Sequence, residues 1–390
     1  MSQVNPDILI WARESAGLSV PEAARKLKLG SKKTSGEQIL QDYESGKRAP
    51  TSKKLAEIAN QYKRPITMFY LNKPPSRGET GEDFRETNNS QLEEFRGPVG
   101  ALIRDVFVRQ SIIKSALIDA EDDEIIDFVG QGGSFPPIDA AKSQISEFLS
   151  LDIDEFRKKR NPHDAFSYLR ESVEKKRFYV LLIGDLGSHH SRIPTDVFRG
   201  FALSDPICPF IVINHNDAKS AWSFTLLHEL VHIWVDKSGI SDNSTENKIE
   251  KYCNDVASQI LVRDEEIDNI NSEIKSFDGN AFRAIQSFAS NFNVSGSMLA
   301  YRLFKRSHIS QDNWASLSKE FKDLWIKEKK KDKTKRKTSS GNYYATQKHR
   351  AGSALIKIIK RSLYEGVLTE TKAGKALGVQ SGNVAELVDL

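Results

Sequence analysis

The sequence predicts an α+β protein that is mostly helical. Helical patterns with short turns fill residues 5–71 and most of the chain after residue 225, whereas three short apolar runs between residues 176 and 214 have the length of strands. With 390 residues, the chain is long enough for two to four domains and a sizeable buried core. Its 28% of charged and 9% of aromatic residues are typical of soluble globular proteins.

The sequence predicts neither a membrane protein nor a disulfide framework. No apolar run approaches the length of a membrane span, and the first seven residues lack the basic start and apolar core of a signal peptide. The two cysteines, Cys208 and Cys253, have no metal-type spacing and indicate a reducing compartment. We therefore expect a cytoplasmic protein without a membrane partner.

Residues 5–71 have the pattern of a small all-helical domain. Ser19 with Glu22 three residues later forms a capping box, a signal for the start of a helix. A helix, a short turn and a second helix with amide and basic residues form the helix-turn-helix pattern of DNA-binding domains. Helices are predicted near residues 6–16, from 19 onwards, near 35–43, through 55–59 and in a short stretch ending at 71.

This segment resembles the XRE (Cro/phage-repressor) family. The resemblance rests on Leu18-Ser19, Glu22-Ala-Ala24, Tyr43-Glu44-Ser-Gly46, Ala49-Pro50 and Leu55-Ala-Glu-Ile-Ala59. It implies binding to double-stranded operator DNA and, because such proteins commonly read two half-sites, a homodimer. The sequence departs from the family at Val20, where many relatives have a polar residue that contacts DNA, and in a longer insert at residues 32–36.

The candidate DNA contacts lie on and around the third helix. The alternative is that these residues form only a solvated polar face. The candidates for base edges are Thr34, Ser35, Gln38 and Gln41, and those for phosphates are Lys32, Lys33, Lys47 and Arg48.

Positive charge is concentrated in two parts of the chain. Residues 1–73 contain 13 Lys and Arg against 7 Asp and Glu, and residues 325–337 contain 8 against 2. Because the net charge of the whole chain is only +4, the remaining residues are net negative. This distribution predicts an N-terminal end that binds nucleic acid, attached to a body that does not.

The stretch Thr225–Trp234 contains an H-E-x-x-H motif, formed by His228, Glu229 and His232. Residues four apart share a helix face, so the two histidines can bind one metal ion. Glu229 is placed to hold a water molecule at that metal without binding the metal itself. The alternative, a chance match, more often falls on a charged and solvated helix than on this almost uncharged one.

A zinc site of this kind needs a third protein ligand, with water in the fourth position. Residues 246–262 have helical spacing, and Glu250 lies on that helix beside its buried face. Asn254, one turn later, is predicted to hydrogen-bond toward the first helix and support the ligands. Glu246 is the competing ligand, and the alternative for Glu250 is a solvated helix charge.

These helices resemble the ImmA/IrrE metallopeptidase family. The resemblance covers residues 165–305 and implies a zincin-like domain with a small sheet that cleaves a partner repressor protein in bacteria or their mobile elements. Cys253 and Val256 stand where the family usually has Ala and Phe, which affects packing and not the chemistry. The resemblance rests on the H-E-x-x-H helix, Glu250-Lys-Tyr-Cys-Asn254-Asp-Val-Ala257, Phe198-Arg-Gly-Phe201 and Ile211-Val-Ile-Asn214.

The predicted cofactor is Zn²⁺, held by His228, His232 and Glu250. The metal lowers the pKa of its bound water. Glu229 then takes the proton as the water attacks a peptide carbonyl, and passes it to the leaving amine.

Other features of the predicted site stay open. Tyr252, His215 and Tyr301 are unranked candidates for a second electrophile. The adjacent pair His189-His190 points to opposite faces of a strand and is not expected to share zinc. In such folds an edge strand pairs with the extended substrate, and residues 210–214 are the candidate edge.

The remaining segments are predicted to be helical or to link domains. Residues 281–304 look like a second, degenerate helix-turn-helix, with simple packing as an even alternative to DNA contact. A disordered basic linker is expected at residues 326–340, and a protein-binding or packing role is open for the last helices. The predicted order is a helix-turn-helix domain (1–73), a linker (74–91), a helical region (92–164), the metallopeptidase domain (165–305), a helix with the basic linker (306–342) and a C-terminal helical segment (343–390).

The sequence thus predicts a bacterial DNA-binding transcription regulator with a zinc-dependent endopeptidase domain that hydrolyses a repressor-type partner. One alternative is a toxin-like or phage-defence component of a toxin–antitoxin pair, whose protein partner is an antitoxin. The other is a DNA-binding regulator whose peptidase domain is a non-cleaving sensor. The intact motif together with Glu250 favours an active site over the sensor.

Overall fold

The computed structural model describes residues 4–31, 34–62, 64–71, 73, 93–187, 191–235, 243–276, 281–336 and 342–389. Over these residues the protein is mostly helical with one small three-stranded sheet, which confirms the predicted class. The predicted linker at residues 74–91 lies outside the described residues. Among the described helices, none has the length and apolar character needed to cross a membrane.

The chain divides into two compact units. The first comprises residues 1–108 with 185–197, and the second comprises residues 109–184 with 198–390. Helix α5 (Glu93–Asp119) contributes residues to both units and lies within the predicted helical region at residues 92–164.

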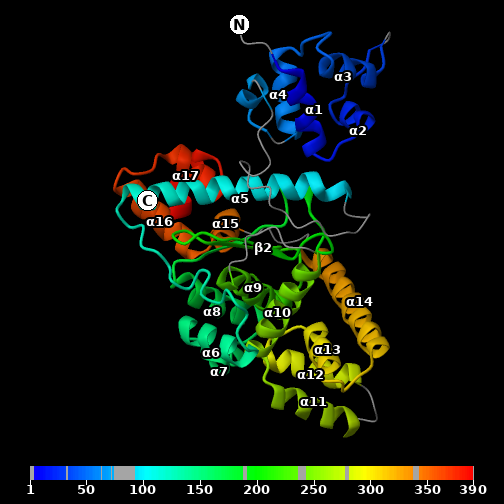
Figure 1. The fold of residues 1–390 in the computed structure, drawn as a ribbon, viewed down its shortest axis with the longest axis vertical. Helices are drawn as coiled ribbons and strands as arrows, with labels where there is room; N and C mark the ends of the chain where they lie inside the picture. Colours follow the sequence, from blue (N-terminus) through cyan, green and yellow to red (C-terminus); the bar gives the residue numbers. More distant parts are fainter. Residues whose placement is uncertain are drawn as a thin grey trace. The chain divides into compact units, whose positions relative to one another are not determined.

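The first unit is built from short helices whose starts are set by side-chain caps. Ser19 and Glu22 form the predicted capping box of α2, and the Ser35 hydroxyl accepts a hydrogen bond from the main chain of α3. Arg13 of α1 donates to Glu44 of α3 at 2.7 Å, a buried ion pair beside the apolar core. The elements are α1 (Pro6–Ser15), α2 (Val20–Lys26), α3 (Gly36–Glu44), α4 (Ser52–Tyr62) and a 3-10 helix (Ile66–Tyr70) (Figure 1).

The second unit contains a mixed sheet with the strand order β1-β3-β2. Strand β3 (Phe210–Ile213) pairs in parallel with β1 (Tyr179–Leu182) and antiparallel with β2 (Gly200–Leu203). β3 is therefore the middle strand, and the prediction that residues 210–214 form an edge is wrong. The reason lies in pairing between distant segments: β3 bonds to β1 on one side and to β2 on the other, whereas the half-buried β2 pairs with β3 alone within the described residues.

Helices cover both faces of this sheet. Figure 1 shows the sheet between α9 and α10 on one side and α15 and α16 on the other. Val180 and Ile211 belong to the core shared with α9, whereas Tyr179 and Phe210 point to the other face, where their rings lie 5.0 Å apart. The sheet thus gives α9 a rigid apolar support.

The remaining helices surround this support. Helix α14 continues to Arg336, so the prediction of a disordered linker at residues 326–340 is wrong for residues 326–336, a run of good helix formers without Gly or Pro. Neither α7 nor α11 was predicted. The helices are α6 (Ile138–Leu149), α7 (Ile153–Arg157), α8 (Pro162–Glu174), α9 (Lys219–Val235), α10 (Asn243–Leu261), α11 (Asp264–Ser276), α12 (Ala281–Phe292), α13 (Gly296–Lys305), α14 (Gln311–Arg336), α15 (Tyr343–Ala351), α16 (Ser353–Tyr364), α17 (Glu370–Leu377) and α18 (Val384–Val388).

Candidate metal centre

Helix α9 carries the H-E-x-x-H motif and is buried around almost its whole surface. Most of its apolar residues, among them Leu226, Leu230 and Trp234, are at most 1% exposed. A helix that is apolar all round must lie inside a protein, and α9 does so between α8, α10 and the sheet. Its two histidines are only half-buried, because the one polar stripe of the helix faces α10.

The structure brings His228, His232 and Glu250 together. The Nε2 atoms of the two histidines are 3.0 Å apart. Glu250 Oε2 lies 3.3 Å from His228 Nε2, and Glu250 Oε1 lies 3.1 Å from His232 Nε2. Zinc bonds of about 2.0–2.1 Å in a tetrahedral site place ligand atoms roughly 3.4 Å apart, so the three atoms need to move only slightly apart to admit the ion. Among the described residues this is the group of His, Cys, Asp and Glu side chains that could hold a metal ion.

The charges in this group also suit a cation. Burial alone would lower the pKa of His228, but its hydrogen bond with Glu250 and the nearby charge of Glu229 outweigh burial and raise it. Burial likewise would raise the pKa of Glu250, but hydrogen bonds with both histidines lower it. Asn254 also interacts with His228, in the supporting position that the sequence predicts. Two imidazoles and a charged carboxylate form a donor set that fits zinc.

Glu229 lies against strand β2, and a glycine makes this possible. Glu229 is 8% exposed. A Cβ atom at Gly200 would lie 3.0 Å from Glu229 Oε1 and 2.6 Å from Cγ2 of Thr225. Only glycine therefore fits at this point of the strand without displacing α9. The role of Gly200 was missed in the sequence, although a glycine inside a strand pattern is a signal of close backbone approach.

The predicted second electrophiles are engaged with other groups. Tyr252 donates to the carbonyl of Pro136 at 2.7 Å, and Tyr301 donates to Asp255 at 2.9 Å. His215 Nε2 lies 3.1 Å from a guanidinium nitrogen of Arg350. The side chains of Glu246, His189 and His190 lie outside the described residues.

The predicted DNA contacts have different surroundings. The Ser35 hydroxyl caps α3, and Gln38 donates to Asp42 at 3.1 Å. Thr34 is half-buried, whereas Gln41, Lys47 and Arg48 are exposed. Lys32 and Lys33 lie outside the described residues.

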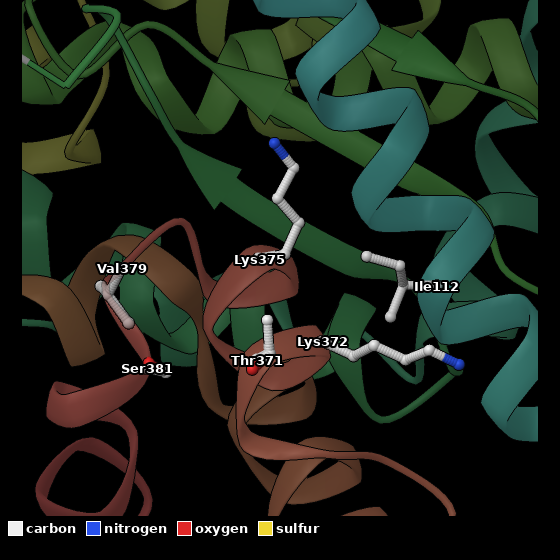
Figure 2. Close-up of a pocket in the computed structure, with 6 residues that line it drawn as sticks. All are labelled: Ile112, Thr371, Lys372, Lys375, Val379 and Ser381. Carbon is white, nitrogen blue, oxygen red and sulfur yellow. The ribbon is translucent and has the colours of Figure 1, made fainter. Parts of the chain in front are cut away.

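A separate depression of about 390 Å³ lies between α5 and α17. Figure 2 shows Lys372 and Lys375 at its border, with their ammonium groups pointing away from each other. The two charges do not converge on one ligand, so this depression is a weaker candidate than the metal centre.

A comparison with known families is consistent with this site. The model of the IrrE N-terminal-like domain, a peptidase family, matches residues 183–304. The matched residues include β2, β3, α9 and α10, and therefore every residue of the candidate metal centre. Neither the curated proteins nor the solved structures contain a significant match to this chain. The match concerns the middle of the chain and does not extend to the N-terminal helices or to residues after 304.

Proposed function

We propose that this chain is a zinc-dependent endopeptidase joined to a DNA-binding domain, and that it regulates transcription by cleaving a repressor-type partner protein. The observation that carries the peptidase assignment is the convergence of His228, His232 and Glu250 beside the buried Glu229, inside the segment that matches a peptidase family. A chance H-E-x-x-H would not be expected to find a third ligand from another helix.

The chain's own residues have distinct roles in this proposal. His228, His232 and Glu250 hold the zinc ion, which supplies a Lewis acid that activates water and polarises the peptide carbonyl. Glu229 accepts the proton of the attacking water and donates it to the leaving amine. Asn254 orients His228, as groups behind metal ligands commonly do.

Strand β2 is the proposed docking edge for an extended substrate. Within the described residues, β2 pairs with β3 along one side only. Its Gly200 lies next to Glu229, so a peptide that pairs with this edge runs past the proposed general base. This replaces the edge predicted at residues 210–214.

The first unit is the proposed DNA-binding part. Its α3 follows α2 through a short turn, and the exposed Gln41, Lys47 and Arg48 lie on or directly after α3. Basic residues outnumber acidic ones by 13 to 7 in residues 1–73, which favours contact with phosphates.

The test combines metal content with peptide hydrolysis. We expect about one zinc per chain in the wild type and in Glu229→Gln, and none in His232→Ala, because only the histidine is a ligand. Hydrolysis of a mixture of fluorogenic peptides should fall about 10³-fold in Glu229→Gln, the size of a general-base effect. A well-folded wild type that binds no zinc would overturn the peptidase, and unchanged hydrolysis in Glu229→Gln would overturn the role of that residue.

A further inference from the structure

The loop that leads from β3 into α9, residues 214–218, is held by the strand ends around it. The main-chain N–H of Asn214 donates to the carbonyl of Arg199 at 2.7 Å. The Asn216 side chain donates to the carbonyl of Gly184, after β1, also at 2.7 Å. These contacts lie within the family-matched residues and connect the sheet to the start of the metal helix.

Two segments beyond the family-matched residues reach back to the same loop. Lys329 of α14 donates to the carbonyl of Asn216 at 2.5 Å. Arg350, in the last turn of α15, brings a guanidinium nitrogen to 3.1 Å from His215 Nε2. The loop therefore receives one contact from each of two C-terminal helices.

The end of α15 also contacts α9 directly. The ring of His349 lies 6.3 Å from that of Trp222, in the first turns of α9. His349 also stacks on His163 of α8, with ring centroids 4.7 Å apart and planes inclined by 15°. Trp222 packs edge-on against Phe166 of α8 at 5.3 Å. These four rings join α8, α9 and α15 at one place.

A buried ion pair of α8 holds the junction between α15 and α16. Arg170 binds Glu174 at 3.0 Å and donates to the carbonyl of His349 at 2.5 Å. Glu174 accepts hydrogen bonds from the main-chain N–H of Ser353 at 3.0 Å and from its hydroxyl at 2.6 Å. Arg170 thus hydrogen-bonds a free carbonyl at the C-terminal end of α15, and Glu174 accepts from a free main-chain N–H at the N-terminal end of α16. Gly352 has a φ of +86°, and a Cβ atom there would lie 2.2 Å from Glu174, so the junction requires glycine.

We propose that Arg350 is a positioning residue for the metal centre, and that the end of α15 acts as a latch on the start of α9. The latch comprises His349 and Arg350, held by the Arg170–Glu174 pair. His228, Glu229 and His232 lie on the same helix, so a displacement at the start of α9 changes where the two histidines lie relative to Glu250. It also changes where the Glu229 carboxylate lies relative to Gly200 of β2. This inference rests on the proposed peptidase function but concerns residues that the family match does not include.

The test compares Arg350→Gln with Arg361→Gln in the full-length protein. Arg361 of α16 also binds the rest of the second unit, through Asp122 at 2.5 Å, but it does not contact the loop. Arg350→Gln leaves in place the main-chain contacts that Arg170 makes with α15. Hydrogen exchange at residues 214–222 should become at least fivefold faster in Arg350→Gln and stay unchanged in Arg361→Gln. The affinity for Co²⁺, measured by chelator competition, should fall about tenfold in Arg350→Gln alone, the lower end of the effect of groups behind metal ligands. Arg350→Lys keeps the positive charge and should restore part of both properties.

The outcomes separate this inference from the proposed function. Equal effects in Arg350→Gln and Arg361→Gln, or unchanged exchange at residues 214–222, would overturn the latch. Faster exchange with unchanged Co²⁺ affinity would overturn its role in positioning the metal centre. A wild type that binds no metal, while exchange responds to Arg350→Gln alone, would overturn the peptidase and leave the latch standing.

Discussion

Two segments of this chain share a local pattern but present different surfaces. In α2–α3 and again in α12–α13, a short helix is followed by a turn and by a second helix whose N-cap is a serine, Ser35 or Ser295. Around α3, Lys47 and Arg48 are exposed, and Arg48 lies over the ring of Tyr43. Around α13, in contrast, cationic side chains pair with aspartates of the preceding helices.

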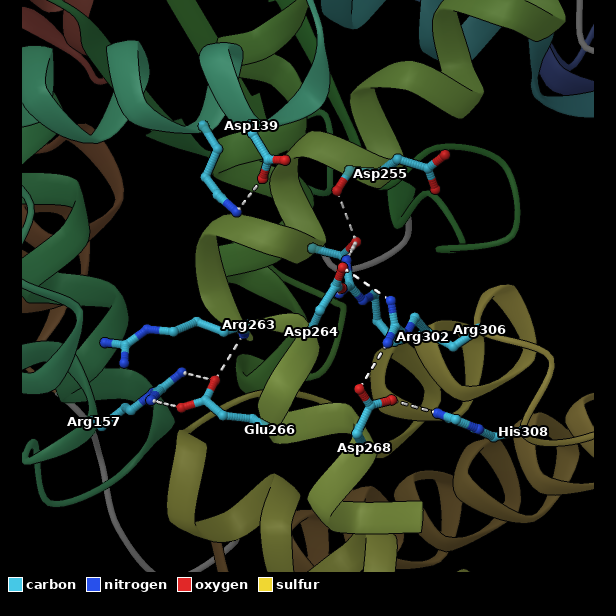
Figure 3. Close-up of polar contacts among 12 residues, drawn as sticks. Asp139, Arg157, Asp255, Arg263, Asp264, Glu266, Asp268, Arg302, Arg306 and His308 are labelled. Atoms are coloured by element: carbon cyan, nitrogen blue, oxygen red, sulfur yellow. Dashed lines mark hydrogen bonds and ion pairs between the residues drawn. The ribbon is translucent and has the colours of Figure 1, made fainter. Parts of the chain in front are cut away.

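The pairing around α13 forms a connected network (Figure 3). Arg302 binds Asp264, and Arg306 binds both Asp264 and Asp268, the latter at 2.7 Å. His308 lies 2.6 Å from Asp268 as well. The acidic start of α11 thus covers the cations of α13, which favours packing over DNA contact for this segment. Helix-turn-helix spacing therefore does not reveal which cations stay available to a phosphate.

The largest expected effect of this difference is on stability. Arg302 is 3% exposed, and Arg302→Met removes its charge while leaving Asp264 without that partner. We expect a loss of about 1–2 kcal/mol in the free energy of unfolding, the contribution of the charge-assisted hydrogen bonds of Arg302, because Asp264 is 38% exposed and keeps its pair with Arg306. Urea denaturation measures it. A loss below about 0.5 kcal/mol would show that the network around α13 contributes little and would weaken the comparison.

The next effect concerns DNA affinity. Lys47→Ala combined with Arg48→Ala should weaken binding to double-stranded DNA roughly tenfold. The slope of log affinity against log salt concentration should fall by the equivalent of about two phosphate contacts. The free energy of unfolding should change by less than about 0.5 kcal/mol, because both side chains are exposed. Fluorescence anisotropy over a range of salt concentrations measures the binding.

Arg306→Gln is the matched control for this pair. It also removes a positive charge from a helix-turn-helix-like segment, but from a side chain that is already paired with two aspartates. DNA affinity should not change in this variant. A loss equal to that of the Lys47 and Arg48 variant would mean that both segments contact DNA.

Much of the candidate site could be predicted from local spacing. The positions of His228, Glu229, His232 and Glu250 follow from helix periodicity and from the chemistry of zinc ligands, and the capping box at Ser19 follows from two residues three apart. Such patterns lie within one or two helices. They can be recognised without knowing which distant segments contact each other.

The parts that could not be predicted depend on contacts between distant residues. Strand order is an example: Phe210–Ile213 has the same length and apolar character as β1, and nothing in its own residues says that it pairs on both sides. Gly200 was not recognised as a contact of Glu229, 29 residues further along the chain. The hydrogen bond between Glu174 and Ser353 joins residues 179 positions apart. Helix α11 was missed because its polar start resembles a loop until the cations of α13 are placed beside it.

The smallest expected effect is a pH dependence in the second unit. Burial of His349, together with the charges of Arg170, His163, Lys219 and Arg350, lowers its pKa to about 4. In the unfolded chain the pKa of histidine is about 6.5, so the unfolded state binds the proton first as the pH falls. The contribution of His349 to the free energy of unfolding is therefore fully present above about pH 6.5 and is lost between about pH 6.5 and 4. We expect the loss to be only about 1–2 kcal/mol, because His349 is partly exposed and solvent screens its interactions.

The histidine signals in NMR titrations and urea denaturation at pH 7.5 and 5.0 measure this dependence. His349→Phe keeps a ring that can stack on His163 but cannot take up a proton, so this variant should lose part of the decline. An equal decline in the wild type and in His349→Phe would place the sensitive group elsewhere. A smaller decline in the variant would show that burial and the neighbouring cations of the second unit lower the pKa of His349 and thereby make the stability depend on pH.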